Sequence, residues 1–422
     1  MPRPRCSLDR RCQHVCQPVN PVVIDVTRLV ARLANNRLPT GVDRVSLAYI
    51  AHYRHHARAL FRHKQRSGLF SESVSQRLFD LLEEWPTGAQ ARVRSLAWQG
   101  VLSCIGRGNA HGRVMFNTGH SGLEDANAAR VVKWHNVRPL FLVHDLIPVR
   151  YPEFCRPGEA ERHEKRLKNM LRLGAGLIAN SDSTLDELHL FADDHGLRVP
   201  PTVVAPLAPA ITMRGPIGER PLAADKPYFV VLGTIEPRKN HLMLLHAWQR
   251  MITLHGDAAP HLVVIGQRGW EAENVEDLLT RSKLLRGHIT VLRQCTDVAL
   301  RAWLHHACAL LFPSFAEGYG MPVVEALAAG LPVIASDLPV LRQMAGNVPE
   351  FLDPIDAIGW IRVIEEYAEP GNRRRANQLA RIQRFQPSTW GEHFAHVDAF
   401  VETLNERPFN AATREERTGL GL

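Results

Sequence analysis

The chain reads F-P-S-F-A-E-G-Y-G-M-P-V-V-E-A-L-A-A-G-L-P-V-I-A-S over residues 312–336. An apolar strand is expected to end as this stretch begins, and a short helix follows the turn, with Pro322 in its first turn and Gly330 at its end. Gly318 and Gly320 lack a Cβ, so the backbone can turn sharply and an anion can approach its amides. Those amides lie at a helix N-terminus, where unpaired N–H groups and the helix dipole favour a phosphate. The stretch therefore predicts a phosphate site at the start of a helix.

Two carboxylates flank this turn. Glu317 lies in the loop and Glu325 inside the helix, so we expect them to face different parts of one ligand. A carboxylate accepts hydrogen bonds from neighbouring hydroxyl groups, which suits a sugar ring at one end and a ribose at the other. The alternative is a helix with one exposed acid and one capping acid.

A basic loop precedes this stretch by about 80 residues. The predicted strand over residues 228–232 runs into G-T-I-E-P-R-K-N, which ends with Arg238, Lys239 and Asn240. Arginine offers a planar fork for phosphate oxygens and lysine a compact charge, so the pair can neutralise a departing diphosphate. Asn240 is expected to cap the next helix. The alternative is a solvated charge pair, and the sequence has no Asp-x-Asp triplet that would hold a catalytic divalent cation.

These motifs resemble those of the retaining glycosyltransferases of family 4, which have the GT-B fold, and are similar to mannosyltransferases of bacterial O antigens. In that family seven residues separate two Glu residues, as they do Glu317 and Glu325 here. The resemblance implies that Glu317 contacts the transferred sugar, that Gly318, Tyr319 and Gly320 contact the diphosphate, and that Glu325 binds the ribose. It also implies that Arg238 and Lys239 stabilise the leaving group without a metal ion or other cofactor.

The first half of the chain carries further candidates that follow predicted strands. The resemblance implies that His144, in H-D-L-I-P, lies beside the transferred sugar, and that Gly41 approaches the diphosphate from the opposite domain. The family often has two adjacent glycines there, and this chain has one. His120 and Ser121 are expected to bind the acceptor. Structural roles remain open for all four, as a capping turn for Gly41 and as loop stabilisation for His120.

In the second half, two loops after predicted strands resemble those that enclose the nucleotide base. Backbone groups near Cys295 and Thr296 are the candidates for reading that base, with Ser336 and Asp337 as weaker ones.

Apolar strands alternate with helical patterns twice, which indicates an α/β fold with two doubly wound, Rossmann-like domains facing a central cleft. The expected divisions are a disordered tail over residues 1–20, an acceptor-binding domain over 21–208, a Pro- and Gly-rich linker over 209–226, a nucleotide-sugar domain over 227–387, a crossover helix over 388–406 and a tail over 407–422. The predicted strands fall at residues 22–26, 114–117, 140–144, 176–180 and 202–205, and then at 228–232, 262–266, 289–292, 309–312 and 332–335. Ser388 is expected to cap the final helix.

Composition limits the remaining classes. The chain has 422 residues, of which 45% are hydrophobic, so it can bury two domain cores, and no apolar run is long enough to span a bilayer. The basic start has no apolar segment behind it, so no secretory signal is expected and a cytoplasmic location is favoured. The seven cysteines predict no disulfide framework, and Cys6, Cys12 and Cys16 with His14 match no standard zinc spacing.

The positive charge lies in the first half of the chain. Its densest run is Y-R-H-H-A-R-A-L-F-R-H-K-Q-R over residues 53–66, which is expected to continue a helix. A basic helical face can bind anionic lipid, so peripheral contact with the inner membrane leaflet is one interpretation and a solvated face is the other. No nucleic-acid module is present, so nucleic acid is not expected as a partner.

The motifs and the resemblance together imply a metal-independent, retaining hexosyltransferase that moves a sugar, with mannosyl from GDP-mannose as one candidate, from a nucleotide-sugar donor to a glycan or lipid-linked glycan in surface polysaccharide biosynthesis. Two alternatives stay open. One is a nucleotide-sugar epimerase or hydrolase of the same fold. The other is a scaffold that binds nucleotide sugar without catalysis.

Overall fold

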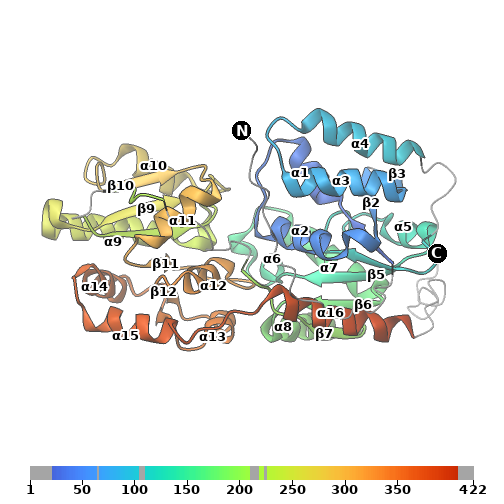
Figure 1. Cartoon of the computed structure of the whole chain (residues 1–422). Helices are drawn as coiled ribbons and strands as arrows, with labels where there is room; N and C mark the ends of the chain where they lie inside the picture. The colour runs from blue at the N-terminus through green and yellow to red at the C-terminus, as the bar shows by residue number, and fades with distance from the viewer. Residues whose placement is uncertain (1–20, 64–65, 104–109, 210–217, 223–225, 407–422) are drawn as a thin grey trace.

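The computed structural model describes residues 21–63, 66–103, 110–209, 218–222 and 226–406. They form two α/β units, each with its own sheet between layers of helices (Figure 1). Within these ranges no helix is both long and apolar enough to cross a membrane. The predictions for Cys6, Cys12, His14 and Cys16 concern residues outside the described ranges.

The first sheet has seven strands in the order β3-β2-β1-β4-β5-β6-β7. All neighbours are parallel except β2 and β3, which are antiparallel. The strands are β1 (Val22–Asp25), β2 (Ala57–His63), β3 (Arg66–Leu69), β4 (Val114–Asn117), β5 (Arg138–Val143), β6 (Gly176–Ala179) and β7 (Thr202–Val204).

Helices cover both faces of this sheet (Figure 1). They are α1 (Thr27–Ala34), α2 (Gly41–Tyr53), α3 (Glu72–Glu84), α4 (Gln90–Ser103), α5 (Ala128–His135), α6 (Ile147–Arg150), α7 (Glu159–Leu173) and α8 (Asp182–Asp194), with short 3-10 turns η1 (Arg54–His56) and η2 (Pro152–Phe154).

The second sheet has six parallel strands in the order β10-β9-β8-β11-β12-β13. The strands are β8 (Tyr228–Leu232), β9 (His261–Ile265), β10 (Ile289–Leu292), β11 (Leu310–Phe312), β12 (Val333–Ser336) and β13 (Glu350–Leu352). The helices are α9 (His241–His255), α10 (Glu273–Arg281), α11 (Asp297–His305), α12 (Met321–Ala328), α13 (Pro339–Ala345), α14 (Ala357–Ala368) and α15 (Arg373–Ile382), with the 3-10 turns η3 (Pro237–Lys239) and η4 (Gly256–Ala258).

The predicted fold class is confirmed, because both sheets are wound by crossover helices as in GT-B proteins. All ten predicted strands are present with their ends shifted by two residues at most. They were recognisable because strands buried on both faces are nearly continuous apolar runs, as in Tyr228–Leu232. Strands β2, β3 and β13 were not predicted.

The prediction that residues 53–66 continue a helix is wrong. Helix α2 ends at Tyr53, and β2 begins at Ala57 beside β1. Ala57, Ala59 and Leu60 are buried, so this segment serves the core, and its basic residues bind other parts of the domain. Arg58, for example, donates to the carbonyls of Phe70 and Leu69. The basic helical face on which the membrane interpretation rested is therefore absent.

Two predicted helix caps are also wrong. Asn240 has a left-handed backbone, and its side chain donates to the carbonyl of Pro354 at 2.8 Å instead of capping α9. The final helix, α16 (Trp390–Asn405), is capped by Thr389 rather than Ser388. Thr389 and Glu392 form a capping box, in which each side chain bonds the other residue's backbone N–H.

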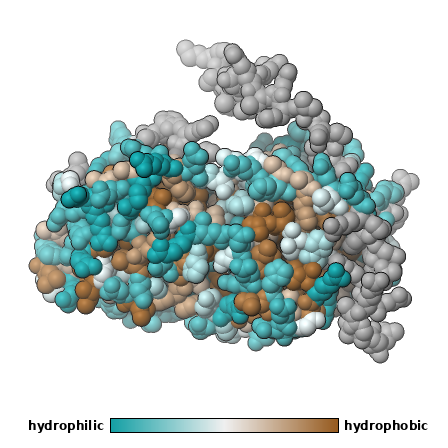
Figure 2. Space-filling model, turned by 90° about the horizontal axis from the view of Figure 1, so that it is seen from below, coloured by the Kyte–Doolittle hydropathy of each residue, from teal (hydrophilic) through white to brown (hydrophobic). Residues whose placement is uncertain are grey.

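Helix α16 leaves the second unit and packs along the first, on the lower side in Figure 1. Its His393 is fully buried, with Nε2 2.9 Å from the Tyr49 hydroxyl and Nδ1 3.1 Å from the carbonyls of Ala205 and Pro206. The face seen from below is mainly hydrophilic, with apolar patches between the polar side chains (Figure 2). The predicted domain boundaries stay a prediction.

Candidate active site

The loops that follow the strands of the two sheets touch one another. The Thr184 hydroxyl, after β6, donates to the carbonyl of Gly318 at 3.4 Å. The ring of Phe154 stacks on Phe315 with centroids 5.2 Å apart. A Cβ placed on Gly318 would lie 2.6 Å from the backbone oxygen of His144, so only glycine fits there. Because ligands of such sheets bind beyond the carboxyl ends of the strands, this contact region is the candidate active site.

Glu317 lies between the two cations of the basic loop. Its Oε1 accepts from Lys239 Nζ at 2.5 Å, and its Oε2 lies 3.0 Å from Arg238 Nη1. Arg238 also binds Glu236 at 2.8 Å and donates to the carbonyl of Ala316 at 2.6 Å. The structure thus brings Glu317, after β11, together with the adjacent pair Arg238 and Lys239, after β8 and 78 residues away in the sequence.

Charge and burial set the ionisation of this cluster. Burial alone would raise the pKa of Glu317, but Arg238 and Lys239 outweigh it and hold the pKa at about 2. Burial lowers the pKa of Lys239, although Glu317 opposes the shift. Burial would also lower the pKa of Arg238, yet Glu317 and Glu236 raise it above its ordinary value. The side chain of Glu317 is only 8% exposed. Such burial disfavours a charged carboxylate, so it is the two cations that keep Glu317 ionised.

Helix α12 begins as the turn predicts. Gly320 is its N-cap residue with φ +85°, a left-handed conformation that glycine adopts without strain. Pro322 lies in the first turn, and Glu325 is buried in the helix. The first-turn backbone therefore stands next to the Glu317 cluster, where an anion would meet a helix N-terminus.

The side chain of Tyr319 does not point to the predicted diphosphate site. Its ring is buried within the core of the first unit, and its hydroxyl donates to the carbonyl of Leu207. Burial raises the pKa of Tyr319. Any contact of Tyr319 with a diphosphate is left to its backbone.

Three histidines of the first unit form a cluster, in which His144 and His163 are buried and His120 is half-buried. His144 Nε2 lies 2.7 Å from the carbonyl of Thr118, and His120 Nε2 lies 2.6 Å from that of Leu142. Their ring centroids are 5.2 Å apart, and His163 lies 5.8 Å from His120. Burial lowers the pKa of all three, so the rings are neutral at pH 7. The side chains are thus engaged with their own loops, and it is the backbone of His144 that faces Gly318.

Ser121 belongs to a polar network at the end of β1. Its carbonyl accepts from Arg62, which also pairs with Asp25. Asn117 donates to Asp25 at 3.0 Å and to Ser121 O at 3.3 Å. The network fixes the loop that carries His120.

Gly41 is the first residue of α2, and the space beside its Cα is open. A side-chain Cβ at this position would have no atom within 4 Å. The turn before it is held by Asp43, whose carboxylate binds Thr40 and pairs with Arg28 at 2.7 Å and Arg32 at 2.8 Å. The backbone amide region of Gly41 is therefore rigid and accessible, as a diphosphate contact would require.

Cys295 and Thr296 lie at the start of α11. The hydroxyl of Thr296 accepts from the amide of Ala299 and caps the helix, and Cys295 is a half-buried free thiol. The next residue, Asp297, pairs with Arg44 of α2 at 2.8 Å across the two units. The loop predicted to enclose the base is thereby tied to the first unit.

Sequence reasoning missed two residues here. Arg44 pairs with Asp297, and the negative charge of Glu325 helps to raise its pKa against the effect of burial. Arg28 packs against Gly119, where a Cβ would lie 2.8 Å from its Cδ, and its charge lowers the pKa of His144. The sequence did place both near predicted site elements. Arg44 is three positions after Gly41, and Arg28 follows β1.

Among the described residues, no group of three or more His, Cys, Asp or Glu side chains has an arrangement that could hold a metal ion.

The chain is similar to known proteins in sequence and in fold. Residues 217–373 match the family described as glycosyl transferases group 1. O-antigen chain mannosyltransferase B of Escherichia coli is 29% identical over 229 residues, 52% of this chain and 59% of its own length. The serotype-specific mannosyltransferase WbdA of Escherichia coli is 27% identical over 252 residues, 54% of this chain and 30% of its own. The chain thus spans between about a third and three fifths of the length of these relatives.

Solved structures share the fold. HepE of Anabaena, in complex with UDP and glucose, aligns over 92% of this chain and all of its own, with a TM-score of 0.61 and 15% identity. Sucrose-phosphate synthase of Thermosynechococcus elongatus aligns over 92% of this chain and 99% of its own, with a TM-score of 0.63 and 16% identity.

The chain therefore has the GT-B fold, matches the family of group 1 glycosyl transferases over residues 217–373 and is similar to O-antigen mannosyltransferases.

Proposed function

We propose that this protein is a retaining, metal-independent glycosyltransferase that moves a hexosyl unit from a nucleotide-sugar donor to a glycan or lipid-linked glycan in surface polysaccharide biosynthesis. The relatives named as mannosyltransferases support mannosyl as the transferred unit, and GDP-mannose is the donor that we propose. One observation carries the proposal, namely Glu317 held between Arg238 and Lys239 beside the N-terminus of α12.

The donor would lie across this cluster. Arg238 and Lys239 bind the diphosphate together with the amides of the first turn of α12, since both supply positive charge to phosphate oxygens. Glu325 binds the ribose, and Glu317 accepts from hydroxyls of the transferred sugar. The open backbone at Gly41 reaches the diphosphate from the first unit.

The transfer step exchanges one bond for another. The acceptor oxygen bonds to the anomeric carbon on the face from which the nucleoside diphosphate departs, and the bond from that carbon to the phosphate oxygen breaks. The acceptor proton passes to the departing phosphate oxygen, so no side-chain base is needed. Arg238 and Lys239 stabilise the charge that develops on the leaving group.

The ionisation of the cluster fits a role for Glu317 in accepting hydrogen bonds from sugar hydroxyls. The epimerase alternative is separated from this proposal by turnover of donor without acceptor. Glu317 is ionised, with a pKa of about 2, and burial keeps His120 and His144 neutral. The proposal places the reaction in the cytoplasm, with membrane contact made through a lipid-linked acceptor.

Transfer from GDP-mannose to a synthetic mannose disaccharide in chelator tests the proposal, with the new linkage identified by NMR. An α-linked product formed without metal supports it. A β-linked product, or turnover of donor without any acceptor, contradicts it.

A further inference from the structure

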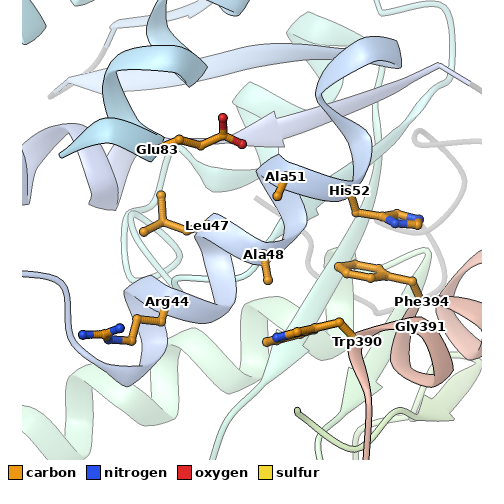
Figure 3. A pocket seen from close by; sticks show the side chains of 9 residues that line it. All are labelled: Arg44, Leu47, Ala48, Ala51, His52, Glu83, Trp390, Gly391 and Phe394. Carbon is orange, nitrogen blue, oxygen red and sulfur yellow. The ribbon is translucent and has the colours of Figure 1, made fainter. Parts of the chain in front are cut away.

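A groove of about 630 Å³ runs along the outer side of α2. Its volume lies in the range of about 300–1,000 Å³ that is usual for small-molecule sites. In Figure 3 the side chains from α2 form one wall, and Trp390 and Phe394 of α16 form the other, with Glu83 of α3 above. The lining residues are Arg44, Leu47, Ala48, Ala51, His52, Glu83, Trp390, Gly391 and Phe394.

The α2 side of this groove, which we call its floor, is apolar. Leu47, Ala48 and Ala51 repeat at helical spacing and leave a shallow surface on α2. Opposite, Phe394 lies parallel to the ring of His52, with centroids 3.9 Å apart and an interplanar angle of 1°. Trp390 stacks on Phe394 at 5.7 Å. The three rings therefore form a stack in which His52 covers one face of Phe394, and half-buried Trp390, at the end of the stack, is the aromatic surface of the groove.

The charges on the rim are paired within the protein. Arg44 binds Asp297, and His52 lies 3.1 Å from Asp398. Glu83 binds Arg54, which also binds a second acid on α3. The rim thus presents hydrogen-bonding groups without an excess of positive charge. A phosphate or an anionic lipid surface would find no complementary field there.

One end of the groove meets the candidate active site. Arg44 both lines the groove and pairs with Asp297 of the second unit, and its pKa is raised in part by the nearby charge of Glu325. A chain lying in the groove would thus have its end at the contact region between the two units.

We infer that this groove is a binding site for the glycan acceptor beyond its reacting end, so that several sugar residues of a neutral glycan lie along α2. The inference rests on the proposed function. Sugar rings pack their C–H faces on aromatic platforms, and their hydroxyls exchange hydrogen bonds with guanidinium and carboxylate groups. The combination of the Trp390 ring, an apolar floor and a polar rim without excess positive charge matches that chemistry.

The test measures binding separately from transfer. The probes are α-linked mannose oligosaccharides of one to six residues, added to the full chain with its tryptophans labelled with ¹⁵N. Trp390→Phe identifies the indole resonance of Trp390. We expect affinity to rise with oligosaccharide length and the Trp390 resonance to shift. In Trp390→Ala, and in Ala51→Phe, which fills the groove without removing packing, the ratio of long to short affinity should fall about tenfold.

Matched controls are Ala51→Ser on the same helix and Trp134→Ala, an exposed tryptophan of α5. Both should keep the dependence on length. The inference is overturned if oligosaccharides bind with the Trp390 resonance unmoved, if both groove variants keep the length ratio, or if phosphatidylglycerol vesicles shift this resonance and oligosaccharides do not. If oligosaccharides shift Trp390 while no donor is turned over, the proposed function fails and the groove assignment stands.

Discussion

Glu317 Oε1 accepts a hydrogen bond from Lys239 Nζ at 2.5 Å, joining the loop after β11 to the loop after β8. The same carboxylate pairs with Arg238. The cations that we assign to the diphosphate are thus held by a side chain that we assign to the sugar. When a donor binds, its phosphates compete with Glu317 for these cations, and the carboxylate can turn toward the sugar hydroxyls.

The first prediction concerns this competition. In Glu317→Gln the cations lose their internal partner, so a free nucleoside diphosphate should bind about three- to tenfold more tightly, while transfer falls about 10²–10³-fold because the sugar loses its acceptor. Calorimetry with the diphosphate and an initial-rate assay measure the two effects. Glu236→Gln is the matched control, since Glu236 also binds Arg238 but not the sugar in our assignment. An equal loss of transfer in both variants would contradict the role of Glu317.

The second prediction concerns stability at low pH. Burial lowers the pKa of His393 to about 4, against about 6.5 in the unfolded chain. The folded state then binds fewer protons than the unfolded state, so the stabilising contribution is complete above pH 6.5 and is lost as the pH falls toward 4. The full loss is about 3 kcal/mol. Thermal unfolding between pH 7.5 and pH 4 should show a shallower slope in His393→Gln than in the natural protein. Identical slopes would exclude His393 as the source.

The third prediction uses two glycines as a pair. A methyl group on Gly318 would meet the backbone of His144 at 2.6 Å, so Gly318→Ala should hold the two units apart and lower transfer at least tenfold. A Cβ on Gly41 meets nothing within 4 Å, so Gly41→Ala should leave the stability of the protein unchanged. If a diphosphate approaches Gly41 closely, Gly41→Ala weakens donor binding alone. Small-angle scattering, unfolding and calorimetry separate these cases, and a Gly318→Ala protein with unchanged scattering and rate would contradict the closed contact.

The fourth prediction concerns the ion pair between Arg44 and Asp297. Both side chains are partly exposed, so the pair should stabilise the contact by only about 0.2–1 kcal/mol and weaken in high salt. A double-mutant cycle with Arg44→Ala and Asp297→Ala, read by donor KM at low and high salt, measures the coupling. A double variant with the charges swapped, Arg44→Asp with Asp297→Arg, should recover part of the coupling energy. Strictly additive effects at low salt would show that the pair does not couple the units.

The fold was predictable because its strands are short apolar runs bounded by loops. The errors have physical causes. Residues 57–63 carry basic side chains within a buried strand, so their charge hid the apolar alternation of Ala57, Ala59 and Leu60. Asn240 suits a helix cap by type, but its left-handed backbone turns the side chain to Pro354.

The candidate site was predictable where a role depends on local sequence, as for Gly320 at the start of α12. The ion pair of Glu317 with the basic loop joins two loops 78 residues apart, and no local pattern predicts it. For the same reason the burial of Tyr319 in the first unit, and the pairing of Arg44 with Asp297, could be seen only once the two units were placed together.

Donor binding in chelator tests the central claim most directly. GDP-mannose, UDP-glucose, UDP-N-acetylglucosamine and dTDP-rhamnose are titrated by calorimetry in EDTA, with Glu325→Ala and Arg238→Ala alongside. We predict that one donor binds without metal and that each substitution weakens this binding, at least tenfold for Arg238→Ala because its charge is lost from the diphosphate. Binding that requires a divalent metal, or that neither substitution changes, would contradict the account.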